Sequence, residues 1–229
     1  MPTMTTVLAT LCFTLMMLNP AVNDEQSKDA QPKEVDKETL MDPNSEQMTK
    51  TAPDTCNVTF DTTAGSFTIQ LHRDWAPIGV DRFYNLAANG FFNDVRFFRV
   101  VPDFIIQFGI HADPEVSTAW RDARIKDDPS TQSNKKGTLT FATAGPGTRT
   151  TQMFINFKDN AFLDSQGFSP LGAVTEGMDI VEKLYAEYGE RPDQGRLQQQ
   201  GNAYLEAEFP KLDYIRSVTV EAVAAEAAE

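Results

Sequence analysis

The segment of residues 97–109, Phe-Phe-Arg-Val-Val-Pro-Asp-Phe-Ile-Ile-Gln-Phe-Gly, constrains the fold more than any other part of this chain. Most of its side chains are apolar types that favour buried strands, and Pro102-Asp103 interrupts the run as a tight turn between two short strands would. Arg99 and Gln107 are separated by an even number of residues, so both face the same side of a sheet if the turn keeps the strands in register. A charged guanidinium rarely lies among such neighbours without a partner or a function. The segment therefore predicts an apolar surface with two fixed polar side chains, the general composition of a small binding pocket.

The charge of the chain argues against one class of partner. The 229 residues suffice for one ordinary domain with tails, and a hydrophobic fraction of 41% is compatible with a packed core. The formal net charge is −13 and no cluster of lysine and arginine is present, so we expect no binding to nucleic acid. The acidity fits a need for solubility, or a saline or extracytoplasmic setting. Nothing in the sequence specifies an oligomer, and we expect a monomer.

The N-terminus has the pattern of a targeting segment. Residues 1–22 carry no charged side chain, and residues 7–18 form an apolar run of the length found in secretory signal peptides. The run is too short to cross a bilayer, so we predict a signal peptide and no stable membrane span. The protein is then exported, to the periplasm or out of the cell. A non-cleaved anchor is the alternative.

Residues 23–55 differ from the rest of the chain in composition. They contain nine acidic residues against four lysines, with scattered Leu40, Met41 and Met48 and no sustained period. Such a segment favours solvation over burial, so we predict a disordered acidic linker. Removal of the signal peptide would leave Cys56 as the only cysteine, with no intramolecular disulfide, and we interpret it as a small core residue.

Alternating apolar and polar residues predict several short strands within one folded domain, residues 56–220. Two of these strands flank Ala64-Gly65 and form a hairpin. Besides the pair around Arg99 and Gln107, the predicted strands are 58–60, 67–71, 139–142, 153–156, 171–174 and 215–220. The following residues, 221–229, are rich in Ala and Glu and are expected to form a frayed tail.

Two helices accompany these strands. The first is predicted to begin at Ala76-Pro77 and to end at Asn89-Gly90, and the second covers residues 179–185. A polar segment, residues 196–209, is a candidate for a third. Many short strands with two well-placed helices favour a mainly β fold, a closed antiparallel barrel capped by the two helices.

Two further clusters have the composition of site elements. Residues 139–156 contain a strand, a Gly/Pro loop and a second strand. The loop lacks the Lys-Ser/Thr of a phosphate-binding P-loop and no helix follows it, so that interpretation fails. Gln152 and Phe154 share one face of the second strand. Residues 160–172 form a loop in which Phe162 and Leu163 stand out as apolar residues, and taken alone these two are more typical of a minor core.

Together these motifs resemble the cyclophilin family of peptidyl-prolyl cis–trans isomerases. Residues 98–109 are similar to the family signature, and the other motifs occur in family order with near-family spacing over residues 57–184. These are Ala142-x-Ala144-Gly145-Pro146, Gln152-x-Phe154, Phe162-Leu163-Asp164 and Gly172-x-Val174-x-Glu176-Gly177-Met178. The resemblance implies an eight-stranded barrel capped by two α-helices, with the active face on its outer surface.

The resemblance also implies a role for each matching residue. Arg99 resembles the catalytic arginine of the family, and Gln107 the glutamine that supports this arginine and the substrate carbonyl. The implied substrate-binding residues are Phe104, Ile105, Ala142, Thr143, Gln152, Phe154, Phe162, Leu163 and Phe168. Phe162 stands where many relatives have tryptophan, Phe168 lies near their histidine, and Thr143 replaces their asparagine. The implied partners are proline-containing polypeptides, and no metal or cofactor is expected.

Two longer segments depart from the family pattern. Between residues 109 and 137 the usual Gly/Asp-rich loop is replaced by a different sequence that includes Ile110-His111. The region after Tyr188 is longer than in minimal relatives and resembles an extension of some bacterial members. The family pattern therefore implies no role for the residues of either segment.

The implied reaction breaks no bond. An X–Pro amide resists rotation because resonance stiffens its C–N bond, with a barrier of about 18–20 kcal/mol. When the amide twists, the proline nitrogen regains a lone pair, and a fixed guanidinium such as that of Arg99 can donate a hydrogen bond to it only in that state. An apolar pocket holds the proline ring while the rest of the peptide rotates. We therefore predict an isomerase that assists protein folding.

Two alternatives remain open. The first is a module that binds proline-containing segments with little turnover, and the second is a chaperone that acts on exported clients. The intact Arg99 favours catalysis, because binding alone does not require it. A hydrolase is disfavoured, since His72 and His111 are the only histidines and no His/Cys cluster has metal-binding spacing.

Overall fold

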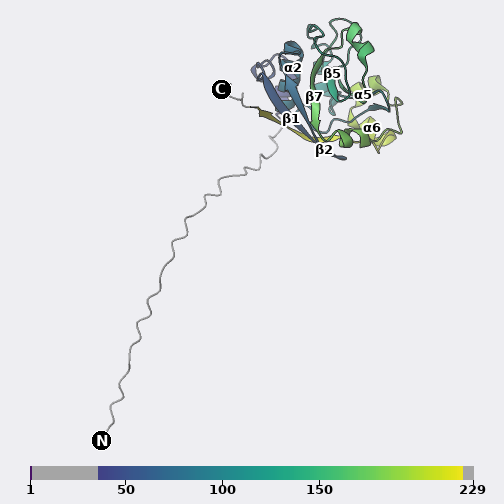
Figure 1. The fold of residues 1–229 in the computed structure, drawn as a ribbon. Helices are drawn as coiled ribbons and strands as arrows, with labels where there is room; N and C mark the ends of the chain where they lie inside the picture. The colour runs from purple at the N-terminus through teal and green to yellow at the C-terminus, as the bar shows by residue number, and fades with distance from the viewer. Residues whose placement is uncertain (2–35, 224–229) are drawn as a thin grey trace. The chain divides into compact units, whose positions relative to one another are not determined.

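The computed structural model describes residue 1 and residues 36–223. Apart from Met1, the predicted signal peptide therefore lies outside the described residues, as do the first part of the predicted linker and the last residues of the predicted tail. Within the described part of the chain, no helix is both long enough and apolar enough to span a membrane. The chain from residue 36 onward is mainly β and is built on eight antiparallel strands (Figure 1).

A single sheet contains all eight strands. Their bounds are β1 (Thr55–Thr62), β2 (Gly65–His72), β3 (Arg99–Val101), β4 (Ile105–Phe108), β5 (Thr138–Phe141), β6 (Met153–Asn156), β7 (Pro170–Glu176) and β8 (Ile215–Ala222). Neighbouring strands follow the order β3-β4-β6-β5-β7-β2-β1-β8, and each pairing is antiparallel. Each strand predicted from the sequence is present, including the β1–β2 hairpin.

The sheet has two end strands, β3 and β8, so the predicted closed barrel is not confirmed. The segments that precede these two strands do meet. The Phe97 N–H donates a hydrogen bond to the Asp213 carbonyl at 3.0 Å, and Arg96 forms an isolated antiparallel bridge with Tyr214. The sheet is therefore a half-barrel whose ends are linked through backbone contacts just before β3 and β8.

The hydrophobic core lies inside the curved sheet. Every second residue of β1 is buried, among them Cys56 and Phe60, as the alternating pattern predicts. The Phe60 ring stacks on Phe67 of β2 at 4.8 Å and meets the edge of Phe108 of β4 at 6.0 Å. Because β1 and β4 lie far apart in the strand order, this contact requires the sheet to curl over its own core. Burial raises the pKa of the Cys56 thiol to about 11, which fits a core residue and not a nucleophile.

Both predicted helices are present, and the structure contains further helical elements that were not predicted. The first is α2 (Pro77–Ala88), which begins with a proline and packs its buried face on β2, β7 and β8. The second is α4 (Met178–Lys183). The helical elements that the sequence did not predict are α1 (Lys37–Met41), α3 (Pro114–Trp120) and the 3₁₀ helices η1 (Glu46–Met48) and η2 (Ala161–Gln166).

The predicted third helical segment is two short helices, α5 (Gln194–Gln200) and α6 (Asn202–Glu208) (Figure 1). They are separated by Gly201, which has a positive φ of 60°. A Cβ atom at this position would come within 2.1 Å of the Ala112 carbonyl oxygen, so only glycine fits. Gly201 therefore lies directly against Ala112, just before α3. In addition, α5 packs against α3.

The prediction of a disordered linker over residues 23–55 is wrong for its described part, 36–55. Leu40 and Met48 are almost fully buried in the main core, and the indole Nε1 of Trp120 donates a hydrogen bond to the Leu40 carbonyl at 2.7 Å. The segment is a strap that runs over α2 and α3. Its few apolar residues show no period because each lies in a different short turn and contacts the core separately.

The boundary of the predicted frayed tail also needs correction. Glu221 and Ala222 belong to β8 and pair with Asn57 and Cys56 of β1. The folded domain therefore extends beyond residue 220. The Ala/Glu-rich composition did not reveal this because a strand paired along one edge needs only backbone hydrogen bonds to continue.

Candidate active site

The β3–β4 hairpin brings together the two polar residues of the segment 97–109. Arg99 and Gln107 are paired across the hairpin, and Arg99 Nη1 donates a hydrogen bond to Gln107 Oε1 at 3.1 Å. The tight turn between them includes Asp103 in the left-handed conformation, with φ of 57°. Gln107 Nε2 donates in turn to Gln152 Oε1 at 2.8 Å. The even spacing in the sequence therefore predicted this arrangement correctly.

A cavity of about 340 Å³ opens beside this chain of side chains, and we call it the first cavity. The predicted site residues line it, except Gln152, which is connected to it only through its hydrogen bond with Gln107. Gln166 also lines the cavity, and the sequence did not reveal it. The lining residues are Arg99, Phe104, Ile105, Gln107, Ala142, Thr143, Phe154, Phe162, Leu163, Gln166 and Phe168.

Apolar side chains from three parts of the chain form the floor of the first cavity. Ile105 of β4, Phe154 of β6 and Leu163 of η2 are buried together as a small cluster apart from the main core. Phe162 is 54% exposed at the rim, where its ring stacks on that of Phe104 at 6.1 Å. The sequence alone favoured a minor core for the η2 residues, and the fold shows them as one wall of a cavity.

One carboxylate holds the η2 wall in place. Asp164 accepts hydrogen bonds from Ser133 Oγ at 2.6 Å and from the backbone N–H and side-chain amide of Asn134, both at 2.8 Å. Burial would raise the pKa of Asp164, but these hydrogen bonds to its charged form outweigh burial and hold the pKa below its ordinary value. Asp164 thus ties η2, which carries Leu163, to the chain at Ser133 and Asn134.

Comparison with known proteins assigns the family. Residues 57–202 match the family described as cyclophilin type peptidyl-prolyl cis-trans isomerase/CLD. The chain belongs to this family. A peptidyl-prolyl cis-trans isomerase of Acinetobacter baylyi is 38% identical over 131 residues, which cover 54% of this chain and 68% of the relative. A peptidyl-prolyl cis-trans isomerase-like 1 of Rhizopus delemar is 35% identical over 133 residues, covering 56% of this chain and 78% of the relative.

Solved structures support the fold of this cyclophilin. The crystal structure of a cyclophilin type peptidyl-prolyl cis-trans isomerase of Cryptosporidium parvum aligns with a TM-score of 0.55 and 19% identity, covering 74% of this chain and 99% of the other. The same Cryptosporidium protein, crystallised in the presence of the dipeptide Ala-Pro, aligns equally well and covers 73% of this chain. At this level of identity the likeness concerns the fold.

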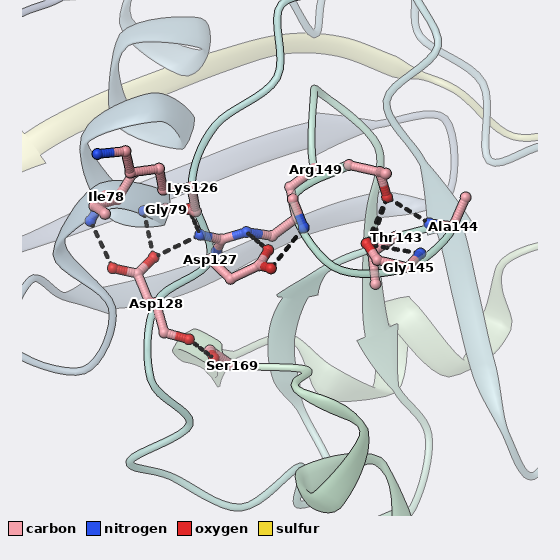
Figure 2. Close-up of polar contacts among 12 residues, drawn as sticks. Ile78, Gly79, Lys126, Asp127, Asp128, Thr143, Ala144, Gly145, Arg149 and Ser169 are labelled. Carbon is pink, nitrogen blue, oxygen red and sulfur yellow. Dashed lines mark hydrogen bonds and ion pairs between the residues drawn. The ribbon is translucent and has the colours of Figure 1, made fainter.

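A buried ion-pair network positions a second wall of the cyclophilin pocket (Figure 2). Arg149 is almost fully buried and contacts Asp128 Oδ2 at 3.0 Å and Asp127 Oδ1 at 3.2 Å. Asp128 also accepts hydrogen bonds from the first N–H groups of α2, those of Ile78 at 2.9 Å and Gly79 at 2.8 Å. The network therefore joins the start of α2 to the loop that follows β5.

That loop carries Thr143, whose Oγ1 lies 2.8 Å from the hydroxyl of Thr148 and also donates to the Gly145 carbonyl. The Gly147 N–H donates to Asp127 Oδ2 at 2.6 Å, which connects the loop to the ion-pair network. Thr143 is thus fixed by its own loop. Its hydroxyl holds the backbone of that loop, since it also accepts a hydrogen bond from the Gly145 N–H at 3.1 Å.

The sequence did not reveal the second partner of Arg99. Glu190 Oε1 accepts a hydrogen bond from Arg99 Nε at 2.6 Å and is also in contact with Nη2. Glu190 lies in the region after Tyr188 that departs from the family pattern, and the Val100 N–H donates to the neighbouring Gly189 carbonyl at 3.2 Å. Since the motif matches of the family do not include this region, no sequence pattern pointed to Glu190.

The two histidines lie outside the first cavity. His72 stacks on Trp75 at 4.4 Å, and the buried His111 accepts a hydrogen bond from the Asp113 N–H at 2.9 Å. Burial lowers the pKa of His111, which keeps its imidazole neutral at physiological pH. Among residues 36–223, no group of three or more His, Cys, Asp and Glu side chains is arranged to hold a metal ion.

Proposed function

We propose that the first cavity binds the proline ring of the substrate, and we call it the proline pocket from here on. Together with Arg99 it carries the peptidyl-prolyl cis–trans isomerase activity of this cyclophilin, and the protein acts as a monomer on proline-containing polypeptides. One observation supports the assignment of the site above all others. The guanidinium of Arg99 lines the same cavity as the apolar cluster of Ile105, Phe154 and Leu163. Catalysis of the rotation requires an apolar pocket for the proline ring and a fixed hydrogen-bond donor for the proline nitrogen.

The hydrogen bonds of Arg99 leave part of its guanidinium free for the substrate. The group has five N–H donors. Nε and one N–H of Nη2 face Glu190, and one N–H of Nη1 is donated to Gln107, so each terminal nitrogen keeps one donor. In the twisted amide a free donor reaches the lone pair of the proline nitrogen, while in the planar amide resonance withdraws that lone pair. The interaction therefore stabilises the transition state more than the ground state.

Gln107 connects Arg99 to Gln152 in this scheme. Its carbonyl oxygen orients the guanidinium, and its amide nitrogen is oriented by Gln152. Gln107 is buried, so its side chain cannot turn freely without leaving a polar group unpaired. The relay from Gln152 through Gln107 to Arg99 keeps the donors in place before the substrate arrives, and this limits the reorganisation needed in the transition state.

The test is the cis-to-trans rate of a short X–Pro peptide with the purified full chain and with Arg99→Ala. We expect the variant to lose about 100-fold or more in kcat/KM, the usual cost of removing one transition-state donor. A matched variant, Arg216→Ala, removes an exposed arginine that pairs with Asp61 on the sheet, and it should retain turnover. Circular dichroism establishes that each variant is folded. Equal turnover by Arg99→Ala would overturn the mechanism.

The same experiment separates the alternatives. A folded wild-type protein that binds an X–Pro peptide without accelerating its rotation would be a binding module. Acceleration of refolding that persists in Arg99→Ala, with no effect on short peptides, would be chaperone action. Loss of both peptide and refolding effects in the variant is the outcome expected for an isomerase.

We propose in addition that the protein is exported. The support is the uncharged, apolar composition of residues 7–18 and the acidic composition that follows. Expression of the full chain, followed by N-terminal sequencing of the mature protein, tests this. A new N-terminus near residue 22 in the extracytoplasmic fraction is expected, and an intact N-terminus in the cytosol would contradict it.

A further inference from the structure

A second cavity of about 410 Å³ adjoins the proline pocket. The two cavities share Gln107, Ala142 and Thr143 as lining residues, and Gln152 of the hydrogen-bond relay lines the second one. A polypeptide that places its proline in the first cavity therefore brings a neighbouring residue of the same chain to the second. The second cavity is in a position to select among substrates.

The lining of the second cavity is cationic in an otherwise acidic protein. Arg121 and Arg124 both line it, and no aspartate or glutamate does. Arg124 has one acidic neighbour, Asp122, at 3.9 Å, and the Asp122 side chain is 85% exposed. Within residues 36–223, no carboxylate forms an ion pair with Arg121. Two guanidinium groups thus face the cavity with little internal compensation.

The backbone of both arginines is well fixed, whereas the charged end of Arg124 has, in the described part of the chain, only the long contact with Asp122 at 3.9 Å. Arg121 directly follows Trp120, which is buried and bonded to the strap through its indole. Arg124 directly precedes Ile125, whose N–H donates to the Arg149 carbonyl at 3.0 Å within the isolated bridge. Both arginines therefore belong to the cavity lining through a fixed backbone, and binding of an anion does not have to displace a strong partner.

The residues that give this cavity its character come from the parts of the chain that depart from the family pattern. Arg121 and Arg124 lie between residues 109 and 137, and Gln194 and Gln198 belong to α5 in the region after Tyr188. The packing of α5 against α3 brings these two segments together. The charge of the cavity is thus carried by residues outside the motifs quoted for the resemblance, although the family match over residues 57–202 spans them.

We propose that the second cavity selects X–Pro segments that carry an aspartate or glutamate close to the proline. This inference rests on the proposed function and names its substrate class. Each arginine can form a charge-assisted hydrogen bond to a carboxylate, and the glutamine amides supply further donors. The net charge of −13 repels acidic polypeptides in general. The two arginines provide a local positive charge that attracts an acidic segment to this cavity.

The test compares short peptides that contain one Ala-Pro bond and differ at a single flanking position, where Glu, Gln or Lys is placed in turn. We expect wild-type kcat/KM at one position to be about three- to tenfold higher for Glu than for the isosteric Gln, and lower still for Lys. The Glu/Gln ratio should shrink when salt is raised to about 0.5 M, because exposed ion pairs are screened. A ratio of one at every position would overturn the proposal.

The double variant R121Q/R124Q should bring the Glu/Gln ratio close to one, while R121K/R124K, which keeps both charges, should retain most of it. Arg216→Gln is the matched control, since it removes an exposed arginine on β8 outside both cavities, and its ratio should equal that of the wild type. A ratio that survives in R121Q/R124Q would overturn the assignment to these arginines.

Failure of this inference is distinguishable from failure of the proposed function. Wild-type turnover of the Glu, Gln and Lys peptides at equal rates would contradict only the acidic preference. Absence of turnover with all peptides would contradict the isomerase assignment itself. Thermal unfolding of both double variants excludes loss of the fold as the cause of a changed ratio.

Discussion

At the scale of single residues, the character of the site depends on how Arg99 is held. Gln107 contacts it from the paired strand, and Glu190 contacts it from a loop 91 residues away along the chain. The first partner is neutral and buried, whereas the Glu190 side chain is 61% exposed. A guanidinium held on two sides keeps its remaining donors in one direction, which is what a transition-state donor requires.

We expect Glu190→Ala to lower kcat/KM about two- to fivefold, because an exposed ion pair contributes roughly 0.2–1 kcal/mol to the orientation of Arg99. Glu206→Ala is a matched control: its side chain is equally exposed and pairs with Arg96 at 2.8 Å, away from the pocket. Peptide isomerisation assays of both variants provide the measurement. An increase in kcat/KM for Glu190→Ala would mean that Glu190 competes with the substrate for Arg99 and does not position it.

At the scale of elements, the walls of the pocket are loops and short helices attached to the sheet by buried polar contacts. The loop after β5 is attached through the network of Arg149, Asp127 and Asp128 (Figure 2). The η2 wall is attached through Asp164. Both attachments use carboxylates that accept backbone hydrogen bonds, Asp128 from α2 and Asp164 from Asn134.

We predict that Arg149→Met lowers the free energy of unfolding by about 3–5 kcal/mol, because it leaves the buried carboxylate of Asp128 without its cationic partner. Lys126→Met serves as the control, since Lys126 is exposed and the network uses only its backbone carbonyl. Its effect should stay within about 0.5 kcal/mol. Urea unfolding measures both, and comparable effects of the two substitutions would contradict the role of the network.

The attachment of η2 predicts a pH dependence. The folded-state pKa of Asp164 is held below its unfolded value, so its contribution to stability is present above the unfolded pKa and is lost as the pH falls through the folded one. We expect the difference in unfolding free energy between the wild type and Asp164→Asn to shrink as the pH drops below about 4. Urea unfolding at a series of pH values tests this. A difference that is constant down to the acid limit would rule it out.

At the scale of the whole molecule, segments from both sides of the matched motifs complete the domain. The strap over residues 36–55 closes one part of the main core. The α5–α6 pair has its own small core, with Leu205 fully buried and Tyr204 packed against Phe209 at 5.7 Å. The same C-terminal region supplies Glu190 to Arg99 and α5 to the second cavity, so these additions bear on the site as well as on stability.

We expect Leu40→Ala to reduce the free energy of unfolding by about 2–5 kcal/mol, since it removes a fully buried side chain of the strap from the core. Met41→Ala changes the next residue, which is 40% exposed, and should cost less than about 0.5 kcal/mol. Isomerase activity of the folded Leu40→Ala protein should be unchanged, because the strap does not line the pocket. Equal stability of the two variants would contradict a structural role for the strap.

Much of the fold and pocket was predictable because the information was local. The even spacing of Arg99 and Gln107 placed them on one face of a hairpin, and the alternation around Phe60 predicted its burial. The strap was missed because Leu40 and Met48 are isolated anchors with no period. Gln166 was missed because a single polar residue on a 3₁₀ turn has no pattern that distinguishes it from a surface residue.

The sequence by itself determined the strands, the two main helices, the mainly β class and the pairing of Arg99 with Gln107, since each depends on the spacing of residues within one short segment. Most other pocket-lining residues were implied by the resemblance of their motifs to the cyclophilin family. Only the tertiary structure decided which distant segments meet: Glu190 with Arg99, the strap with the core, and α3 with α5 around the second cavity. The physical reason is that these contacts depend on how the sheet curls over its core. That curvature is the sum of many strand pairings and aromatic contacts, which no single segment encodes.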